Sequence, residues 1–180
     1  MFKEAKLPPG FPQPGPVDEV IVKEYPGYRA ARTTPPAGAR DPSSAMFNPL
    51  FNHIKKNQVK MTVPVEMTYT DAAATQPADQ QPQPINMAFL YERPDQGTTG
   101  KDGNIEVLDL PAVTVLSVTI RGNYNPRTFA AGMKKLHDYL DAHPGQFTVA
   151  GPPRYLAYNS PMIPWFWRVG EVQIPVTTKK

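Results

Sequence analysis

The sequence predicts an α+β protein with a single domain, built from two similar strand–helix–strand–strand units. Three observations lead to this prediction: two segments with helical apolar spacing, several segments in which apolar and polar residues alternate, and the same order of elements in both halves. With 180 residues, 40% of them hydrophobic, the chain can bury one core and is too short for two. The repetition predicts an internal duplication around a pseudo-two-fold axis.

Residues 1–17 are expected to form an extended arm outside the core, because residues 7–16 hold five prolines and two glycines. The folded domain then covers residues 18–176, with half-repeats at about 18–92 and 105–176, and residues 177–180 form a tail. Residues 71–84, rich in Gln, Ala and Pro, are expected to be a mobile loop between two strands.

The first half begins with a predicted strand pair over residues 17–34, interrupted at YPGY (25–28). Residues 44–57 form the first predicted helix, with Ser43 or Ser44 as its cap. The apolar residues of this helix recur at i, i+3, i+4 and i+7, at Phe47, Leu50, Phe51 and Ile54. They are therefore expected to face the core.

Two further strands complete the first half. KMTVPVEMTY (60–69) alternates apolar and polar residues, and Pro64 requires an edge position or a bulge in that strand. Residues 85–92 alternate in the same way and are the expected partner strand.

The second half repeats this order. IEVLDLP (105–111) corresponds to VIVKEYP (20–26), and residues 112–122 continue as a strand that is apolar on both faces and therefore central. A helix follows and ends near residues 143–145, and residues 154–176 supply the last two strands. The apolar positions of this helix are Phe129, Met133, Leu136 and Leu140.

Composition excludes several classes of function. The chain has no cysteine, so disulfides, thiolate metal sites and cysteine nucleophiles are excluded. Its 19 basic and 16 acidic residues are scattered along the chain, which argues against a nucleic-acid partner and is compatible with a small acidic ligand. No segment approaches the roughly 20 apolar residues of a membrane span. We expect a soluble protein, monomeric by default, either cytoplasmic or exported after loss of a leader.

NSPMIPWFW (159–167) holds both tryptophans of the chain, yet its two prolines predict a loop. Bulky apolar residues are scarce in loops. This loop is therefore expected either to close on the core as a lid or to form a wall of a binding site.

FNPLFNHIKKNQVKMTVPVEMTY (47–69), YNSP (158–161) and RVGEV (168–172) resemble segments of the SOUL haem-binding protein family, over about residues 18–176. The resemblance implies a distorted β-barrel of two four-stranded antiparallel sheets with two flanking helices, related to the effector domains of bacterial multidrug-responsive regulators. It also implies that haem or another tetrapyrrole binds in a groove between the first helix and the loop joining the last two strands, for haem transport, buffering or sensing.

That groove would have an apolar wall suited to a flat π-system. The expected ligand-binding residues are Met46, Leu50, His53, Asn57, Met162, Ile163, Trp165, Phe166 and Trp167. His53 is the candidate axial iron ligand, because helical spacing places it on the flank of the first helix, facing sideways and not into the core. His137 and His143 are the other two histidines, on or just after the second helix. Since nothing else on the first helix is placed to orient the second nitrogen of His53, stacking is expected to supply most of the affinity.

Two other functions remain open at this point. A hydrolase or isomerase could use the same groove, with Glu66, Tyr69 or Glu171 as acting residues, although no catalytic motif occurs and binding is the stronger expectation. A protein-interaction module could use the arm and the aromatic loop. Arg168 and Glu171 are expected to form an ion pair that stabilises the fold.

Overall fold

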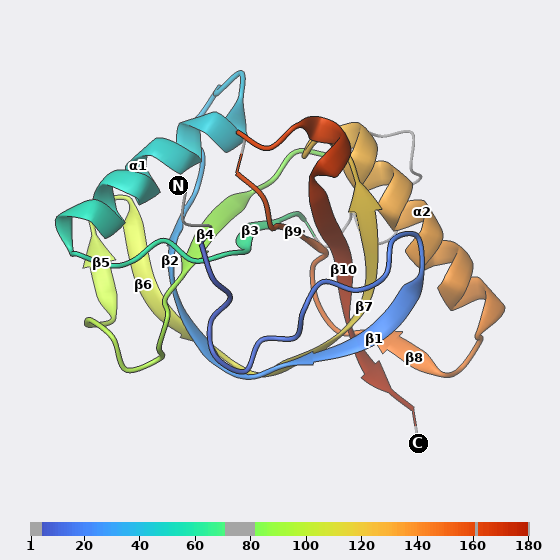
Figure 1. Ribbon diagram of the computed structural model, residues 1–180. Helices are drawn as coiled ribbons and strands as arrows, with labels where there is room; N and C mark the ends of the chain where they lie inside the picture. Colours follow the sequence, from blue (N-terminus) through green and yellow to red (C-terminus); the bar gives the residue numbers. More distant parts are fainter. Residues whose placement is uncertain (1–4, 71–81, 161, 180) are drawn as a thin grey trace.

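The computed structural model describes residues 5–70, 82–160 and 162–179, and the predicted loop at 71–84 lies mostly outside this part of the chain. Most of the strands and helices lie close to the ranges that the sequence predicts (Figure 1). In chain order they are β1 (Val20–Tyr25), β2 (Tyr28–Thr33), α1 (Pro42–Lys56), β3 (Val65–Thr68), β4 (Asn86–Leu90), β5 (Gly100–Asp102), β6 (Ile105–Leu110), β7 (Val113–Arg121), α2 (Pro126–Ala142), β8 (Phe147–Val149), β9 (Arg154–Ala157), the 3-10 helix η2 (Trp165–Trp167) and β10 (Val169–Thr178).

The strands form one large antiparallel sheet in the order β1-β7-β10-β9-β3-β4-β2-β6-β5, with β8 added to the end of β10. In the described residues the two ends of this order do not pair with each other, so the sheet does not close into the expected barrel. The α+β class is confirmed, and β7 lies inside the sheet as predicted. β3 is also an interior strand; it begins after Pro64, so the predicted edge position or bulge is wrong.

With β5 left aside, equivalent strands of the two half-repeats follow in the same order from either end of the sheet. β1 pairs with β7 and β6 pairs with β2, so the first strand of each predicted half-repeat joins the second strand of the other. The centre of the sheet is the pairing of β3 with β9, from Val65 opposite Ala157 to Thr68 opposite Arg154. Residues 17–34 do contain two strands, as predicted, but the two do not pair with each other. β1 pairs with β7, and β2 pairs with β4 and β6.

Both helices begin at proline residues that follow side-chain caps. Asp41, rather than Ser43 or Ser44, caps α1, because its carboxylate accepts the backbone N–H of Ser44 at 3.2 Å. Asn125 caps α2, with Thr128 completing a capping box. α1 packs on β2, β4 and β6, and α2 packs on β1, β7 and β10. Among the described residues, neither helix has the length and apolar character required to cross a membrane.

The two faces of the sheet bury different clusters. Leu116, Tyr155 and Ile174 belong to the main core, which also contains the buried residues of both helices. Their sequence neighbours Val115 and Leu156 belong to a second cluster, as alternation along a strand requires.

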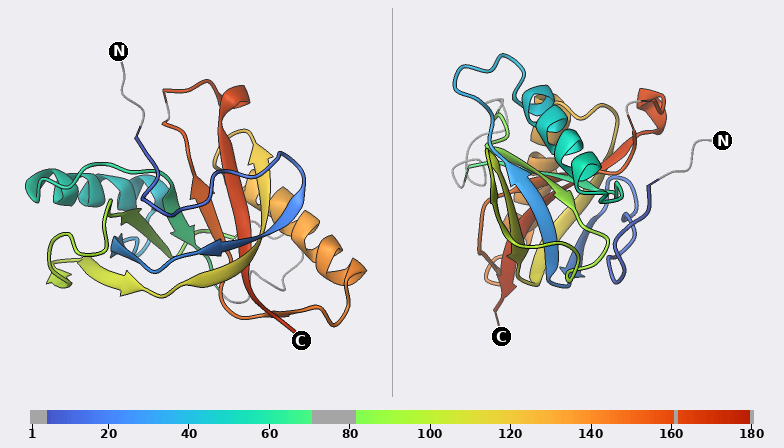
Figure 2. Two further views of the ribbon diagram at one scale, coloured as in Figure 1. Left: turned by 60° about the horizontal axis from the view of Figure 1, so that its bottom comes forward. Right: turned by 90° about the vertical axis from the view of Figure 1, so that its left-hand side faces the viewer.

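That second face is covered by residues 5–18, called the arm here, rather than left open (Figure 2). Leu7 and Phe11 of the arm pack against the clusters on this face. The arm was expected to lie extended outside the core, but it turns at residues 8–11, where the Phe11 N–H donates to the Pro8 carbonyl oxygen at 3.1 Å. Its apolar side chains contribute to a small core of their own.

Candidate functional site

The buried face of helix α1 overlaps the predicted one at Leu50 and Ile54 and also includes Met46 and His53. Its buried residues are Met46, Leu50, His53 and Ile54. Met46 and Leu50 are 0% exposed, so they lie beneath the surface and not on a groove wall. Phe51, which was expected in the core, is 44% exposed. The buried face is therefore shifted toward Met46 and His53, so that Phe51 is exposed and Phe47 packs at the edge of the core.

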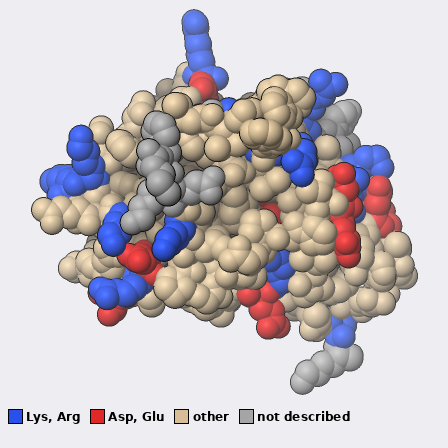
Figure 3. Space-filling view, in the orientation of Figure 1, with Lys and Arg blue, Asp and Glu red and all other residues tan. Residues whose placement is uncertain are grey.

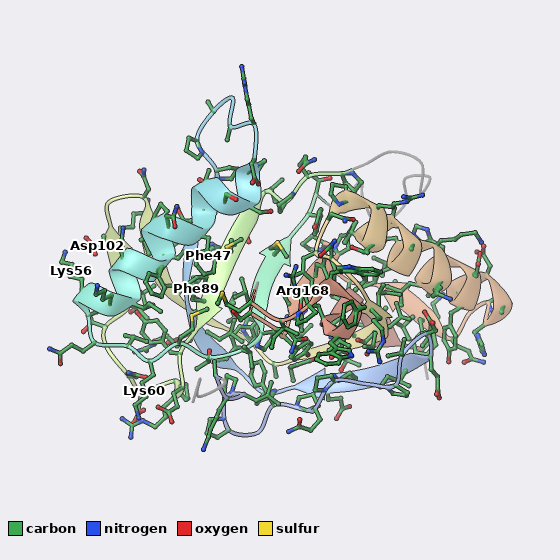
Figure 4. The ribbon with its side chains drawn as sticks, turned by 45° about the horizontal axis from the view of Figure 1, so that its top comes forward. Phe47, Lys56, Lys60, Phe89, Asp102 and Arg168 are labelled. Atoms are coloured by element: carbon green, nitrogen blue, oxygen red, sulfur yellow. The ribbon has the colours of Figure 1, made fainter. Side chains whose placement is uncertain are left out.

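Three phenylalanine rings, those of Phe47, Phe51 and Phe89, form an aromatic strip along α1. The Phe47 and Phe51 rings stack with their centroids 6.1 Å apart at an angle of 12°. Phe47 also meets Phe89 of β4 edge-on, with the centroids 5.1 Å apart. In Figure 4, Phe47 and Phe89 lie on the side of α1 that faces Arg168, next to η2. The spacing of Phe47 and Phe51 at i and i+4 is the sequence signal for this strip.

The loop that contains η2 presents its apolar side chains to solvent. The exposed fractions are 76% for Met162, 59% for Trp165, 46% for Phe166 and 65% for Trp167, and Ile163 is half-buried. The rings of Trp165 and Phe166, and those of Phe166 and Trp167, meet edge-on. A lid on the core would bury these residues, so the lid alternative is wrong.

Hydrogen bonds at the base of the loop fix its position. The Arg168 guanidinium donates from Nε to the carbonyl oxygen of Ile163 at 2.7 Å and from Nη1 to Asn123 Oδ1 at 2.9 Å. Arg121 donates to the carbonyl oxygen of Phe166 at 3.2 Å. The loop therefore holds its aromatic side chains outward on a fixed base, an arrangement suited to contact with a ligand or partner.

His53 is buried, at 6% exposed, so the prediction that it faces sideways toward solvent or a groove is wrong. Its Nδ1 lies 3.1 Å from Oδ2 of Asp102 on β5, and its Nε2 lies 3.3 Å from the hydroxyl of Tyr91. Asn57, at the end of α1, is exposed and donates from Nδ2 to the carbonyl oxygen of His53 at 2.8 Å. Asp102 is the orienting carboxylate that was not found on α1, because it comes from a distant strand.

The other two histidines are associated with α2. His143 stacks on Tyr139 with the ring centroids 4.0 Å apart, and its Nδ1 lies 2.8 Å from the carbonyl oxygen of Tyr139. His137 is half-buried on α2. Across residues 5–70, 82–160 and 162–179, no group of three or more His, Asp or Glu side chains is arranged to hold a metal ion.

Basic side chains lie around this surface. Lys56 and Lys60 lie at and just beyond the C-terminal end of α1, and both are exposed. Lys56 Nζ is 3.7 Å from Asp102 Oδ2, a weak surface pair. In the space-filling view (Figure 3), Lys and Arg are scattered over the face that carries α1 and η2, some at its edge and some well inside it, with uncharged areas between them.

The carboxylates considered for catalysis lie elsewhere. Glu66 and Glu171 are 7% and 0% exposed, on the face of the sheet that the arm covers. Glu171 pairs with Lys23 at 2.7 Å, so the predicted ion pair with Arg168 is wrong. Tyr69 is 3% exposed and stacks on Phe129, with the ring centroids 3.7 Å apart. None of the three side chains is open to a substrate in this structure.

A surface depression of about 350 Å³ lies at the turn between β1 and β2, lined by Glu24, Tyr25, Pro26, Ala112, Val113 and Thr114. None of these residues belongs to α1 or η2. It is therefore separate from the candidate surface, and its few polar groups do not form a recognisable binding set.

An open antiparallel sheet with two helices places the chain in the α+β class of folds. The SOUL heme-binding protein family matches residues 16–175, so the chain belongs to that family. Curated protein sequences give no significant match.

Solved structures share the fold at low sequence identity. The EcmrR C-terminal domain superposes with a TM-score of 0.62 at 18% identity, covering 88% of this chain and 97% of that one. EcmrR in a complex with DNA gives 0.64 at 15% identity, covering 88% and 57%. A structure described as a hydrolase from Listeria innocua gives 0.60 at 10% identity, covering 91% and 94%. At these identities the similarity is one of fold alone.

Proposed function

We propose that the protein binds haem or another tetrapyrrole on the surface between α1 and the η2 loop, for haem transport, buffering or sensing. The observation that carries the proposal is the exposure of Trp165, Phe166 and Trp167 on a firmly based loop in a chain of the SOUL family. Exposed apolar surface of this size is unusual unless it serves binding. Porphyrin rings are broad and flat and gain most of their affinity from such apolar contact.

Two walls of different origin would hold the ring. The η2 loop supplies Met162 and its three aromatic residues, and α1 supplies Phe47 and Phe51 in place of the buried Met46 and Leu50. Lys56 and Lys60, at and just beyond the C-terminal end of α1, are the basic groups that would pair with the propionates of haem. Bound haem would supply an iron centre for electron transfer or gas binding. The protein residues named here would bind and orient the ring.

Ligation of the iron by His53 would require its ring to leave Asp102 and Tyr91 and to reach the surface. The structure offers no exposed imidazole on α1 or η2 among the described residues. We therefore propose that apolar stacking holds the ring and that His53 is a structural residue, with axial ligation by His53 as the outcome that would revise the proposal.

The experiment is a titration with hemin and, in parallel, with metal-free protoporphyrin. Both tryptophans of the chain lie in η2, so a tetrapyrrole that binds there quenches the intrinsic tryptophan fluorescence by energy transfer. We expect saturable quenching at one site per chain, with affinity on the order of micromolar because an open surface buries only part of the ligand. Similar affinity for the two rings is expected. Absence of saturation with both rings would contradict the proposal.

A protein-interaction module remains the alternative that the exposed loop also favours. It predicts no saturable binding of either ring, and loss of the partner after replacement of Trp165 or Trp167. The enzyme alternative has no such support, because Glu66, Tyr69 and Glu171 are buried.

We also infer that the two half-repeats arose by duplication. The reciprocal pairings β1–β7 and β6–β2 and the central pairing β3–β9 support this inference. The corresponding helices α1 and α2 each follow the second strand of their half.

A further inference from the structure

The face of the sheet under the arm contains a buried polar and aromatic cluster that the proposed function does not use. We call it the arm-covered cluster; its principal members are Lys23, Tyr25, Tyr28, Arg154, Glu171 and Gln173. All six are less than a tenth exposed. None belongs to α1 or η2, so this cluster is separate from the proposed tetrapyrrole surface.

Hydrogen bonds link the cluster into one network. Glu171 accepts from Lys23 Nζ at 2.7 and 3.0 Å, from the Tyr158 hydroxyl at 2.6 Å and from the Ser117 hydroxyl. Gln173 accepts from Arg154 Nε at 2.7 Å and donates to the Tyr25 hydroxyl at 2.8 Å. It also donates to the Ser117 hydroxyl at 3.1 Å, and this bond connects Arg154 and Tyr25 to Glu171. Glu171 thus has as many donors as its two oxygens readily accept.

The arm closes this cluster with one aromatic side chain and one carbonyl group. The Phe11 ring meets Tyr25 edge-on at 5.2 Å and Tyr28 edge-on at 5.3 Å between centroids. The carbonyl oxygen of Gln13 accepts from Lys23 Nζ at 2.8 Å. A phenyl ring and a hydrogen-bond acceptor therefore occupy the space above the cluster, and both come from the three-residue segment Phe11–Gln13.

Backbone hydrogen bonds join the arm to the rest of the chain near its two ends. Its backbone pairs with the rest of the chain through Val63 N–H to Lys6 O at 3.1 Å and Asp18 N–H to Thr119 O at 2.8 Å. Between these points Phe11 is only half-buried, and Gly10 has a φ of +82°, which lets the arm turn immediately before Phe11. Such a segment can lift locally without unfolding the sheet.

One donor beneath the arm has no partner. Arg154 is 6% exposed, and its Nη2 is buried and has no hydrogen-bond acceptor in the described part of the chain. Lifting the arm would also remove the Gln13 carbonyl oxygen from Lys23. The groups left open would then include two donors, Lys23 Nζ and Arg154 Nη2, beside the rings of Tyr25 and Tyr28 and the Glu66 carboxylate, which accepts from the Tyr28 hydroxyl at 2.6 Å. A buried donor without an acceptor is costly, so a ligand that supplies one would be favoured.

We propose that the arm is a built-in plug on a second ligand site, which accepts a small aromatic compound bearing a hydrogen-bond acceptor such as a carboxylate or an amide carbonyl. The ring of the compound takes the place of Phe11 between Tyr25 and Tyr28. Its acceptor takes the place of the Gln13 carbonyl oxygen or reaches Arg154 Nη2. The ligand and the arm compete for one space, so the arm sets the apparent affinity.

The test uses the full-length chain with Phe11→Ala, which removes the plug ring, and 3-phenylpropionate and 3-phenylpropionamide as probes. Binding is measured by calorimetry and by the change in melting temperature. Phe11→Ala is expected to bind both probes saturably, at least about 10-fold more tightly than the unaltered chain, because a competent state that is rarely populated lowers apparent affinity in proportion. Phe11→Leu keeps an apolar plug and is expected to stay near the unaltered affinity.

Two controls separate this site from non-specific binding. 3-Phenylpropylamine has the same ring and a cationic donor head in place of the acceptor, and it is expected to bind Phe11→Ala at least about 10-fold more weakly than the amide. Phe51→Ala removes an exposed ring on α1 and should leave probe binding unchanged.

Equal binding of the amine and the amide, or no gain in affinity on Phe11→Ala in a variant that circular dichroism shows to be folded, would overturn the proposal. The result is independent of hemin binding, which is read from the tryptophans of η2.

Discussion

Lys23 Nζ lies 2.7 Å from Oε1 of Glu171, and the two side chains are 4% and 0% exposed. They come from β1 and β10, the two neighbours of β7, so the pair spans three strands of the sheet. A buried pair of this kind is a matter of balance, because each charge is tolerated only in the presence of the other.

Replacement of one partner should therefore be costly. Lys23→Met is expected to lower the free energy of unfolding by about 3–5 kcal/mol, because Glu171 is left as an uncompensated buried charge. Urea denaturation measures the change. The double variant Lys23→Met with Glu171→Gln should recover much of the loss, and Arg93→Met, from a pair exposed on both sides, should cost less than about 1 kcal/mol. A loss below about 1 kcal/mol for Lys23→Met would show that water reaches the pair.

The aromatic loop should contribute to binding and little to stability. Trp165→Ala and Trp167→Ala are each expected to change the free energy of unfolding by less than about 0.5 kcal/mol, since both side chains are more than half exposed. Each should weaken hemin binding about 10-fold through lost stacking. Hemin absorbance titration and thermal melting measure the two effects. Phe129→Ala is the contrasting control: that residue is 0% exposed, and its loss should cost about 3–5 kcal/mol.

His53 should behave as a structural residue. His53→Ala removes the contacts to Asp102 and Tyr91 and is expected to lower the free energy of unfolding by about 1–3 kcal/mol, leaving the Soret band and spin state of bound hemin unchanged. Absorbance and electron paramagnetic resonance spectra make the comparison. A variant that loses a low-spin signal and most of its hemin affinity, yet still binds the metal-free ring, would identify His53 as the axial ligand.

Stability should fall at alkaline pH because several tyrosines are buried. Burial raises the pKa of Tyr155 to about 12, and it also raises the pKa values of Tyr28 and Tyr158. In the unfolded chain these phenols lose their protons near pH 10, whereas the folded chain keeps them. The unfolded state then binds fewer protons, so the stabilisation is complete below about pH 10 and is lost as pH rises toward 12 and above.

The free energy of unfolding, measured by urea denaturation between pH 9 and pH 11, should therefore decline by up to about 1.4 kcal/mol per pH unit for each such tyrosine. Tyr155→Phe removes one titrating group and should make the decline shallower. A profile that is flat up to pH 11 would mean that these phenols ionise as easily in the folded chain as in the unfolded one.

The sequence predicted the elements well because their signals are local. Alternation placed β3 and β4, and helical spacing placed α1 and α2 within a few residues. The rotation of α1 about its axis was not predictable in this way. A stripe centred on Phe47 and one centred on Leu50 differ by only about 60° around the helix axis, at 100° per residue. The packing against β4 decides between them.

The difference between local and distant signals also explains which parts of the candidate site the sequence indicated. The η2 loop stood out because bulky residues lay between prolines. The partners of His53 did not, because Asp102 and Tyr91 come from distant segments. The role of the arm was also missed: five prolines indicate an extended chain, but they carry no information about the surface on which Phe11 lies.

The reciprocal exchange of β1 and β6 has a consequence for dividing the chain. A fragment that ends after β4 would keep β1 without its partner β7, and a fragment that begins at β6 would keep β7 without its partner β1, so that this apolar strand would present a bare edge. Each fragment lacks strands that its own strands pair with, although the cut falls between the two half-repeats. The pieces should be insoluble separately and recover native structure only when mixed, so the boundary between repeats is not a boundary between independently folding units.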